Sequence, residues 1–254
     1  STVAGSVLAA YVGLLGGNDV TEQLKFATHL LTASVMAAPG AVAVSKIIFP
    51  DLEKNSEHST EIKKEKTKGN ILLSITSGTI EGVKLAVNVG AMLLVFLAFI
   101  ALFNDIMWLI GDLLNFNVLI SETTNFNQFS IEFVLGYLLA PLMWLIGVTY
   151  QECALMGQLL GIKIVSSEFV AFIQLADFRN TETPISLLSK KSITMATFML
   201  CGFANLASIG IQIGGIGVLA PKQRKQLSEL GFKAMIGGTI VSLISACFAG
   251  ILII

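Results

Sequence analysis

An uncharged stretch from Ser192 to Pro221 constrains the fold more than any other part of the sequence. A helix needs about 20 predominantly apolar residues to cross a bilayer, and this stretch is longer. Its centre, GFANLASIG at 202–210, carries an amide, a hydroxyl and several glycines in place of leucine and isoleucine. Such groups are tolerated at membrane depth only where protein or a water-filled cavity satisfies them. The stretch therefore predicts a broken membrane helix at 192–220.

The composition indicates a polytopic membrane protein around this helix. Hydrophobic residues make up 54% of the 254-residue chain, charged residues only 13%, and the mean hydropathy is +0.78. An ordinary soluble domain carries roughly 25% charged residues. The net charge of -1, without a basic patch that includes aromatic residues, does not point to a nucleic-acid partner. We therefore expect an all-α integral membrane fold in contact with membrane lipid.

An internal repeat refines this expectation. AGSVLAAYVGLLGG, which starts at Ala4, is echoed by LASIGIQIGG, which starts at Leu206, and a Gln-Leu pair follows each copy. Paired, glycine-interrupted segments in the two halves of a membrane protein mark the midplane site of many secondary transporters. The repeat favours an inverted-repeat transporter bundle.

Changes in composition divide the chain into four expected parts. These are residues 1–50, the end of a first-repeat transport bundle with two helices; 51–82, a charged cytoplasmic loop and an interfacial helix; 83–115, a scaffold and trimerisation helix; and 116–254, a second-repeat transport bundle. Within the last part we expect an interfacial helix, a re-entrant hairpin at 151–176, the broken helix at 192–220 and a last helix at 234–254. Prolines are expected to interrupt two helices, at Pro39-Gly40 and at Pro141.

Loop charge sets the expected orientation. The loop at 51–70 holds five lysines and the loop at 221–233 holds four basic residues, whereas 18–22 and 105–132 hold none. The positive-inside rule places the first two loops in the cytoplasm. The spans at 26–45 and 192–220 then run inward, and those at 85–104 and 234–254 run outward.

Glu168 is the first candidate site residue. It belongs to an apolar segment, Cys153–Leu175, that glycines and Lys163 interrupt. This segment is too polar to face lipid and favours a re-entrant hairpin buried in protein. A carboxylate at that depth is by default a functional-site hypothesis, here as an acceptor for substrate hydroxyls. The structural alternative is a carboxylate paired with Lys163 or with backbone donors.

Three further candidates lie in the broken helix. Asn205 and Ser208 stand three residues apart, so on a helix they would share one face. There they would present an amide and a hydroxyl to a polyol ligand. The alternative is interhelical hydrogen bonding, which is common in membrane bundles. Phe203 either forms a wall of the site or belongs to the core.

The first repeat copy contains a candidate cation site. Four residues border Gly5: Thr2, Val3, Ser6 and Val7. Exposed carbonyls in broken transporter helices coordinate Na⁺. Tight helix packing through Gly5 accounts for the same residues equally well.

Five stretches resemble the concentrative nucleoside transporters, a cation-coupled family that includes bacterial NupC-like proteins. In chain order they are GSVLAAYVG, HLLTASVMAAPGAVAVSKIIFP, LGYLLAPLMWLIGV, SSEFVAF and GFANLASIGIQIGG. The resemblance implies a homotrimer in which each subunit carries its own substrate path and moves by an elevator-like mechanism. It also implies that Cys153–Leu175 is the second of two re-entrant hairpins. The long scaffold helix at the trimer centre would contain Leu85–Asn104.

The family's substrate ligands match residues of this chain. The resemblance implies that Glu168, at the tip of the second hairpin, binds ribose hydroxyls. The motif Phe-Ala-Asn-x-x-Ser places Asn205 and Ser208 on the ribose, with Phe203 close by.

The resemblance also implies that Val7 lies beside the nucleobase and that Thr2 and Val3 hold two of the sodium ligands. The first hairpin, with its Gly-Gln-Thr-Glu motif, is not in this chain. Two positions depart from the family pattern near the site. Ser167 stands where Asn precedes the tip acid, and Ala207 stands where Ser is common.

These features predict a nucleoside symporter, driven by Na⁺ or H⁺, that crosses the bacterial inner (plasma) membrane several times. No bond is made or broken, so we expect neither an enzyme nor a cofactor. A secondary transporter of another polar solute, a sugar or an amino acid, is the alternative. An intramembrane enzyme using Ser6 or His29 is a second one, but Ser6 lacks a Gly-x-Ser-x-Gly elbow. Because the chain opens on Ser1 inside an apolar run, we expect it to be the C-terminal portion of a longer protein.

Overall fold

The computed structural model describes residues 2–50, 70–124, 126–179, 187–219 and 221–252, and nearly all of them are helical. The elements are α1 (Gly5–Gly16), α2 (Val20–Ile48), α3 (Ile71–Leu113), α4 (Phe116–Thr123), α5 (Ile131–Leu145), the 3₁₀ turn η1 (Tyr150–Glu152), α6 (Cys153–Val165), α7 (Glu168–Arg179), α8 (Lys190–Leu200), α9 (Leu206–Leu219), the 3₁₀ turn η2 (Pro221–Gln223) and α10 (Arg224–Leu252). The expected charged loop, at 51–69, lies outside the described residues.

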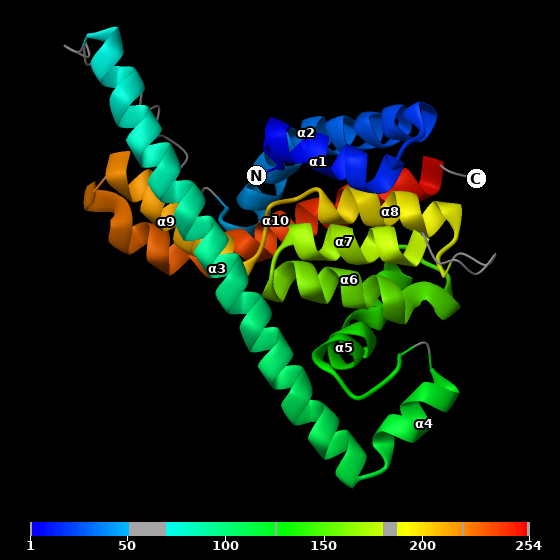
Figure 1. Ribbon diagram of the computed structural model, residues 1–254. Helices are drawn as coiled ribbons and strands as arrows, with labels where there is room; N and C mark the ends of the chain where they lie inside the picture. Colours follow the sequence, from blue (N-terminus) through cyan, green and yellow to red (C-terminus); the bar gives the residue numbers. More distant parts are fainter. Residues whose placement is uncertain (1, 51–69, 125, 180–186, 220, 253–254) are drawn as a thin grey trace.

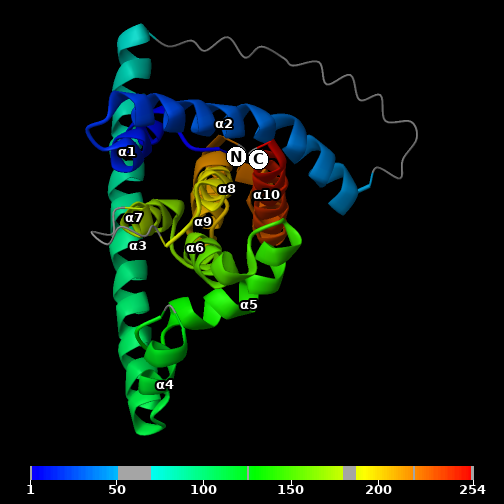
Figure 2. The same cartoon turned by 90° about the vertical axis from the view of Figure 1, so that its right-hand side faces the viewer.

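The helices form a bundle with one long helix along its side (Figure 1). α6, α7 and α8 lie next to one another, and α10 packs against α2, α8 and α9. Figure 2 shows α3 as a straight rod beside this bundle and α2 crossing its top. α3 contacts α4 and α5. The hydrophobic core therefore lies in the bundle, and no described side chain of α3 belongs to it.

Two of the described helices, α2 and α10, are long and apolar enough to cross a membrane. They contain the expected span at 26–45 and the described part of the span at 234–254, but both helices begin earlier. Asp19 caps α2, because its carboxylate accepts a 2.8 Å hydrogen bond from the Thr21 amide. Hydrogen bonds from Thr21 also hold the pKa of the Asp19 carboxyl below its ordinary value.

The expected interruptions at two prolines are wrong. α2 runs through Pro39, and α5 runs through Pro141 and ends at Leu145. A proline inside a helix removes one backbone hydrogen bond and costs about 3 kcal/mol. The packing of α2 on α10 and of α5 on α6 offsets this cost. At the α2–α10 contact, a Cβ on Gly40 would lie 3.0 Å from a methyl group of Val241, so glycine allows close approach there.

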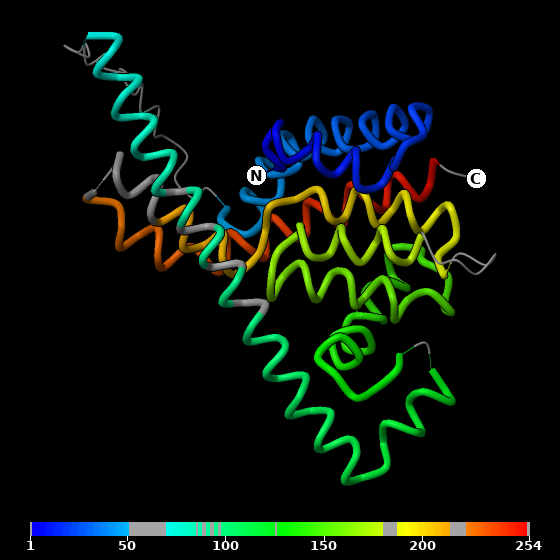
Figure 3. The backbone as a smooth tube through the Cα atoms, viewed as in Figure 1, coloured from blue at the N-terminus to red at the C-terminus, as the bar shows by residue number. Residues whose placement is uncertain are grey.

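α3 is continuous from Ile71 to Leu113 and shows no break at 82, where we expected an interfacial helix to end. Asn115 then takes a left-handed conformation with φ 56°, and the chain turns by 98° between Ala98–Leu113 and α4, as the backbone trace shows (Figure 3). Together, the two parts of this bent pair are long and apolar enough for a membrane span. The division of 71–113 between an interfacial and a scaffold role stays a prediction.

Candidate functional site

The segment expected to form a hairpin is a helix–turn–helix. α6 and α7 pack against each other, and Ser166 and Ser167 join them. Every residue from Leu155 to Lys163 is buried. α5 covers α6 closely, because a Cβ on Gly157 would meet the Gly136 carbonyl oxygen. The chain thus encloses this hairpin on several sides, whereas its re-entry into a membrane stays a prediction.

The expected broken helix consists of α8 and α9, which are separated by non-helical residues at 201–205. The extended segment before α1 runs along this break, since Thr2 and Gly202 form an antiparallel bridge. The two glycine-marked segments of the repeat therefore meet at their irregular ends. Two irregular segments in contact expose backbone groups that regular helices would use internally.

Asn205 and Ser208 do not share a helical face, contrary to the prediction, because Asn205 precedes α9 and caps it. Asn205 Oδ1 accepts a 2.6 Å hydrogen bond from the backbone N–H of Ser208, and Ser208 Oγ accepts a 3.2 Å bond from the backbone N–H of Asn205. This reciprocal pattern has the form of a capping box. The cap fixes both side chains at the start of α9.

Glu168 joins the hairpin to this cap. Asn205 Nδ2 donates a 2.8 Å hydrogen bond to Glu168 Oε2, and the two residues are only 1% and 4% exposed. A carboxylate offers about four lone-pair sites, of which this bond uses one. The remaining sites give a buried carboxylate that can accept further hydrogen bonds. Hydrogen bonds thus link Glu168 to Asn205 and Asn205 to Ser208, and the part of all three in binding stays a prediction.

Of the two structural alternatives for Glu168, the ion pair with Lys163 is not formed, whereas pairing with backbone donors stays a prediction. Lys163 is fully buried and donates instead to the Met199 carbonyl at 2.7 Å and to Ser242 Oγ at 3.2 Å. Lys163 thus binds the last turn of α8, and Glu168 binds Asn205 just before α9.

Two small cavities adjoin the break. Phe203 and Ser208 line one of about 380 Å³ between α9 and the first half of α10. Thr2, Gly202 and Ser242 line another of about 20 Å³. The smaller one has room for about one water molecule. Phe203 therefore borders open space next to Ser208, as a wall residue would.

Val3 and Val7 lie near the irregular start of α1. Val3 is buried at 8% exposure, and Val7 is partly buried against the core. Thr2 lies against the break, where it pairs with Gly202. The predicted roles of Thr2, Val3 and Val7 in binding stay predictions.

Sequence reasoning missed Tyr11. Its side chain is fully buried, its ring stacks on Phe172 with 4.1 Å between centroids, and its hydroxyl has no hydrogen-bond partner among the described residues. The buried Ser166 hydroxyl at the hairpin turn likewise has no hydrogen-bond partner among the described residues. Tyr11 follows Val7 by four residues and so shares its face of α1. That spacing is the signal that could have found it.

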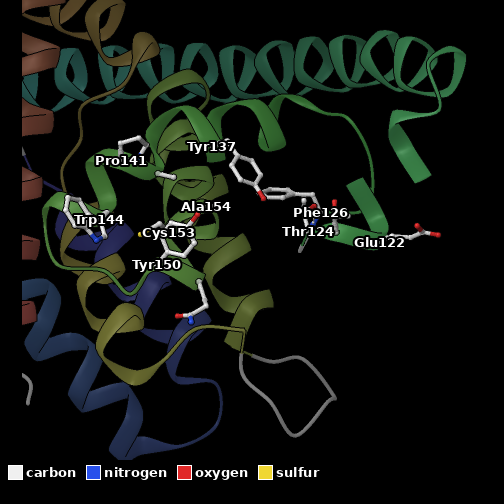
Figure 4. A pocket seen from close by; sticks show the side chains of 12 residues that line it. Glu122, Thr124, Phe126, Tyr137, Pro141, Trp144, Tyr150, Cys153 and Ala154 are labelled. Atoms are coloured by element: carbon white, nitrogen blue, oxygen red, sulfur yellow. Dashed lines mark hydrogen bonds between the residues drawn. The ribbon is translucent and has the colours of Figure 1, made fainter. Parts of the chain in front are cut away.

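A much larger cavity lies elsewhere. Figure 4 shows it between α4, α5 and the start of α6, with Tyr137, Trp144 and Tyr150 among its lining residues. Its volume is about 1070 Å³. It shares no lining residue with the break, and Glu122 is the acid at its rim. We place the candidate site at the break because the buried carboxylate and the paired irregular segments are there.

A family model matches most of the chain. Its description is Na⁺ dependent nucleoside transporter C-terminus, and it covers residues 29–250. Solute carrier family 28 member 3 of Eptatretus stoutii is 38% identical over the whole chain, and sodium/nucleoside cotransporter 2 of Rattus norvegicus is 35% identical over 99% of it. An uncharacterized transporter of Haemophilus influenzae is 36% identical over the whole chain. The chain spans 36%, 37% and 56% of these relatives' lengths, respectively.

Solved structures are similar over 98% of the chain. CNTnw in an inward-facing substrate-bound state is 35% identical, with a TM-score of 0.77, and the chain covers 54% of it. A CNTnw variant in an intermediate state gives 0.78, and another in an outward-facing state gives 0.77. These nearly equal scores support the fold and assign no transport state. The relatives are transporters, so the intramembrane-enzyme alternative is set aside.

Proposed function

The chain belongs to the Na⁺-dependent nucleoside transporter family, and from that premise we propose that it supplies the ribose-binding half of a cation-coupled nucleoside symporter. The observation that carries the proposal is the buried Glu168–Asn205 pair at the break. A family fold without this pair would support membrane transport but no particular ligand. The pair gives the site a defined chemistry.

Ribose matches that chemistry. Its neighbouring hydroxyls are donors, and Glu168 retains free lone pairs that accept them. Bonds to an ionised acceptor are shorter and roughly twice as strong as neutral ones. Asn205 keeps one amide hydrogen beyond its bond to Glu168, so it can donate to a ribose oxygen. The cap at the start of α9 holds this amide in place before any ligand arrives.

The coupling cation is proposed to bind at Thr2 and Val3. The bridge between Thr2 and Gly202 brings an extended segment to the break, which supports this assignment. Carbonyls of unwound transporter segments coordinate Na⁺. A cation that binds at Thr2 and Val3 and raises substrate affinity would itself bind more tightly, by the same factor, when substrate is present. Proton coupling remains the alternative for the same pathway.

The finer architecture follows from the same premise. We infer an inverted repeat, because the two glycine-marked segments meet at their irregular ends, and a re-entrant hairpin formed by α6 and α7. The hairpin, α8, α9 and α10 would move together as an elevator against α3, and α3 would lie at the centre of a homotrimer. We assign the protein to a bacterial inner membrane.

Uridine uptake tests the proposal. The natural full-length chain that carries this sequence is reconstituted into proteoliposomes, first with an inward Na⁺ gradient and then with a pH gradient alone. Uptake driven by Na⁺ supports the symporter with Thr2 and Val3 as ligands. Uptake driven only by protons keeps the nucleoside function and removes the Na⁺ site.

A panel of competing solutes tests the substrate class. We expect nucleosides to displace bound uridine, and we expect sugars and amino acids to leave it in place. Displacement by a free sugar or an amino acid, without displacement by nucleosides, would favour the other polar-solute transporter.

A further inference from the structure

We propose that Lys163 is a tethered cation: its ammonium group neutralises the carbonyl end of α8 at the break, where a mobile cation would otherwise bind, and so positions Asn205 for substrate. The inference deepens the proposed function and rests on it, because the nucleoside substrate is taken from that proposal. It concerns a residue that the ribose and sodium assignments leave without a role.

The first step is the place of the ammonium group. The last carbonyls of a helix have no partner within the helix. Met199 lies in the last turn of α8, and its carbonyl accepts a 2.7 Å hydrogen bond from Lys163. Ser242 Oγ on α10 accepts the second bond at 3.2 Å while it donates to the Gly238 carbonyl. One side chain of the hairpin thus binds two other helices.

The second step is the sign of the charge. A helix carries a partial negative charge at its C-terminus and a partial positive charge at its N-terminus. Lys163 binds the C-terminal end of α8, and Glu168 binds Asn205 at the N-terminal end of α9. The hairpin therefore inserts one charge of each sign into the break, each at the helix end that it stabilises.

The third step is the fit. In transporters with broken helices, unwound carbonyls and the C-terminal ends of half-helices coordinate the coupling cation. Here a Cβ on Gly202 would collide with Ser242 Oγ and lie 3.4 Å from Lys163 Nζ. The break is closed tightly around the ammonium group, so this carbonyl end already holds its cation. A mobile cation is then left to the segment that contains Thr2 and Val3.

If the lysine side chain is shortened, a soluble ammonium ion should take the place of its ammonium group. Lys163→Ala would join the volume of the lost side chain to the cavity of about 20 Å³ that Gly202 and Ser242 line. Ammonium or methylammonium fits such a space and offers the same donors to Met199 and Ser242. Lys163→Met removes the charge but keeps the space filled.

The experiment measures the thermal unfolding midpoint of the full-length chain in detergent, with ammonium, methylammonium or choline chloride at constant ionic strength. Both variants should unfold at a lower temperature than the unmodified protein. Ammonium and methylammonium should restore at least half of the lost midpoint in Lys163→Ala and none of it in Lys163→Met. Choline is too large and should restore neither. Equal losses in both variants, without an ammonium response, would overturn the proposal.

Uridine affinity supplies the positioning readout. The dissociation constant should rise at least tenfold in Lys163→Ala and should fall again with ammonium. A midpoint that responds to ammonium in a protein that binds no nucleoside would uphold the tethered cation and reject the proposed function. The two failures are therefore distinguishable.

A milder pair of variants applies if neither lysine variant folds. Ser242→Ala removes one acceptor of Lys163, and Ser245→Ala is its matched control. Both serines are buried on α10 and bond to the carbonyl four residues earlier, but of the two it is Ser242 that accepts from the lysine. Uridine affinity should fall severalfold more in Ser242→Ala. Equal affinities in the two variants would reject the role of Lys163.

Discussion

The hairpin α6–α7 and the long helix α3 differ in burial: the hairpin is enclosed by other helices, whereas much of α3 is exposed. The hairpin is enclosed by α5, α8 and α1 and buries two opposite charges, each with a partner from another element. Every side chain described between Ile71 and Phe99 on α3 is exposed. A buried charge requires a fixed, hydrogen-bonded partner. An exposed apolar helix requires cover from lipid or from another protein.

Length adds to the contrast. At 1.5 Å per residue, the 43 residues of α3 extend for about 65 Å, roughly twice the hydrocarbon thickness of a bilayer. As the membrane-crossing scaffold helix that we propose, α3 would tilt strongly or project beyond the bilayer. The difference between the two regions is that the hairpin satisfies its buried charges within the chain, whereas α3 leaves its apolar side chains to be covered by lipid or by another protein.

The largest expected effect follows from neutralising the acid of the hairpin. Glu168→Gln keeps an oxygen that accepts from Asn205 but loses the charge. Hydrogen bonds to charged groups contribute about 1.5–3 kcal/mol each, so two ribose bonds predict a loss of uridine affinity of about 100-fold. Isothermal titration measures it. The control is Glu229→Gln on the exposed part of α10. Unchanged affinity in Glu168→Gln would remove Glu168 from the site.

The second prediction addresses α3. Leu94 and Leu72 are both 70% exposed. Leu94→Lys should impair membrane insertion, because a lysine at the centre of a span costs about 2.5–3.5 kcal/mol. Leu72→Lys should be tolerated, since this end of the helix is expected at the cytoplasmic surface. The amount of protein in washed membranes measures both. Equal yields would show that Leu94 is not in the bilayer.

The third prediction concerns Asn205, because its side chain both caps α9 and donates a hydrogen bond to Glu168. Asn205→Ala should lower the stability by about 0.5–2 kcal/mol and also weaken uridine binding. Asn205→Ser keeps a capping oxygen but cannot reach Glu168 with an amide. It should therefore recover most of the unfolding midpoint and little of the affinity. If the serine variant also recovered affinity, the amide would have no part in binding.

The sequence predicted the hairpin and the break because polar residues inside apolar segments are costly at membrane depth unless protein satisfies them. It failed at Asn205, where capping took precedence over the face shared at three residues' spacing. It also failed at the prolines, since the packing of α2 on α10 and of α5 on α6 is not visible within one chain segment. The partners of Lys163 could not be predicted, because Met199 contributes a backbone carbonyl and Ser242 is distant in the sequence. A carbonyl that accepts a hydrogen bond leaves no residue-type signature.

The smallest expected effect concerns Tyr11, which is an exception to the rule that the hairpin region pairs its buried polar groups. Three buried polar atoms without a partner lie on or against the hairpin, on Tyr11, Ser166 and Gln174, so this region does not satisfy all of its own groups within the described residues. An unpaired buried hydroxyl costs about 1–3 kcal/mol. Tyr11→Phe should therefore raise the unfolding midpoint of the free protein by a few degrees.

If that hydroxyl serves the ligand, the same variant should bind uridine severalfold more weakly. Fluorescence melting and titration measure the two changes on one preparation. Greater stability with unchanged affinity would mean that water or another part of the full-length chain pairs with Tyr11. The opposite signs of the two effects distinguish a group reserved for substrate from one that only packs. The hairpin region should show them and the first part of α3 should not, because the hydroxyls of Thr76, Ser77 and Thr79 already donate to carbonyls of their own helix.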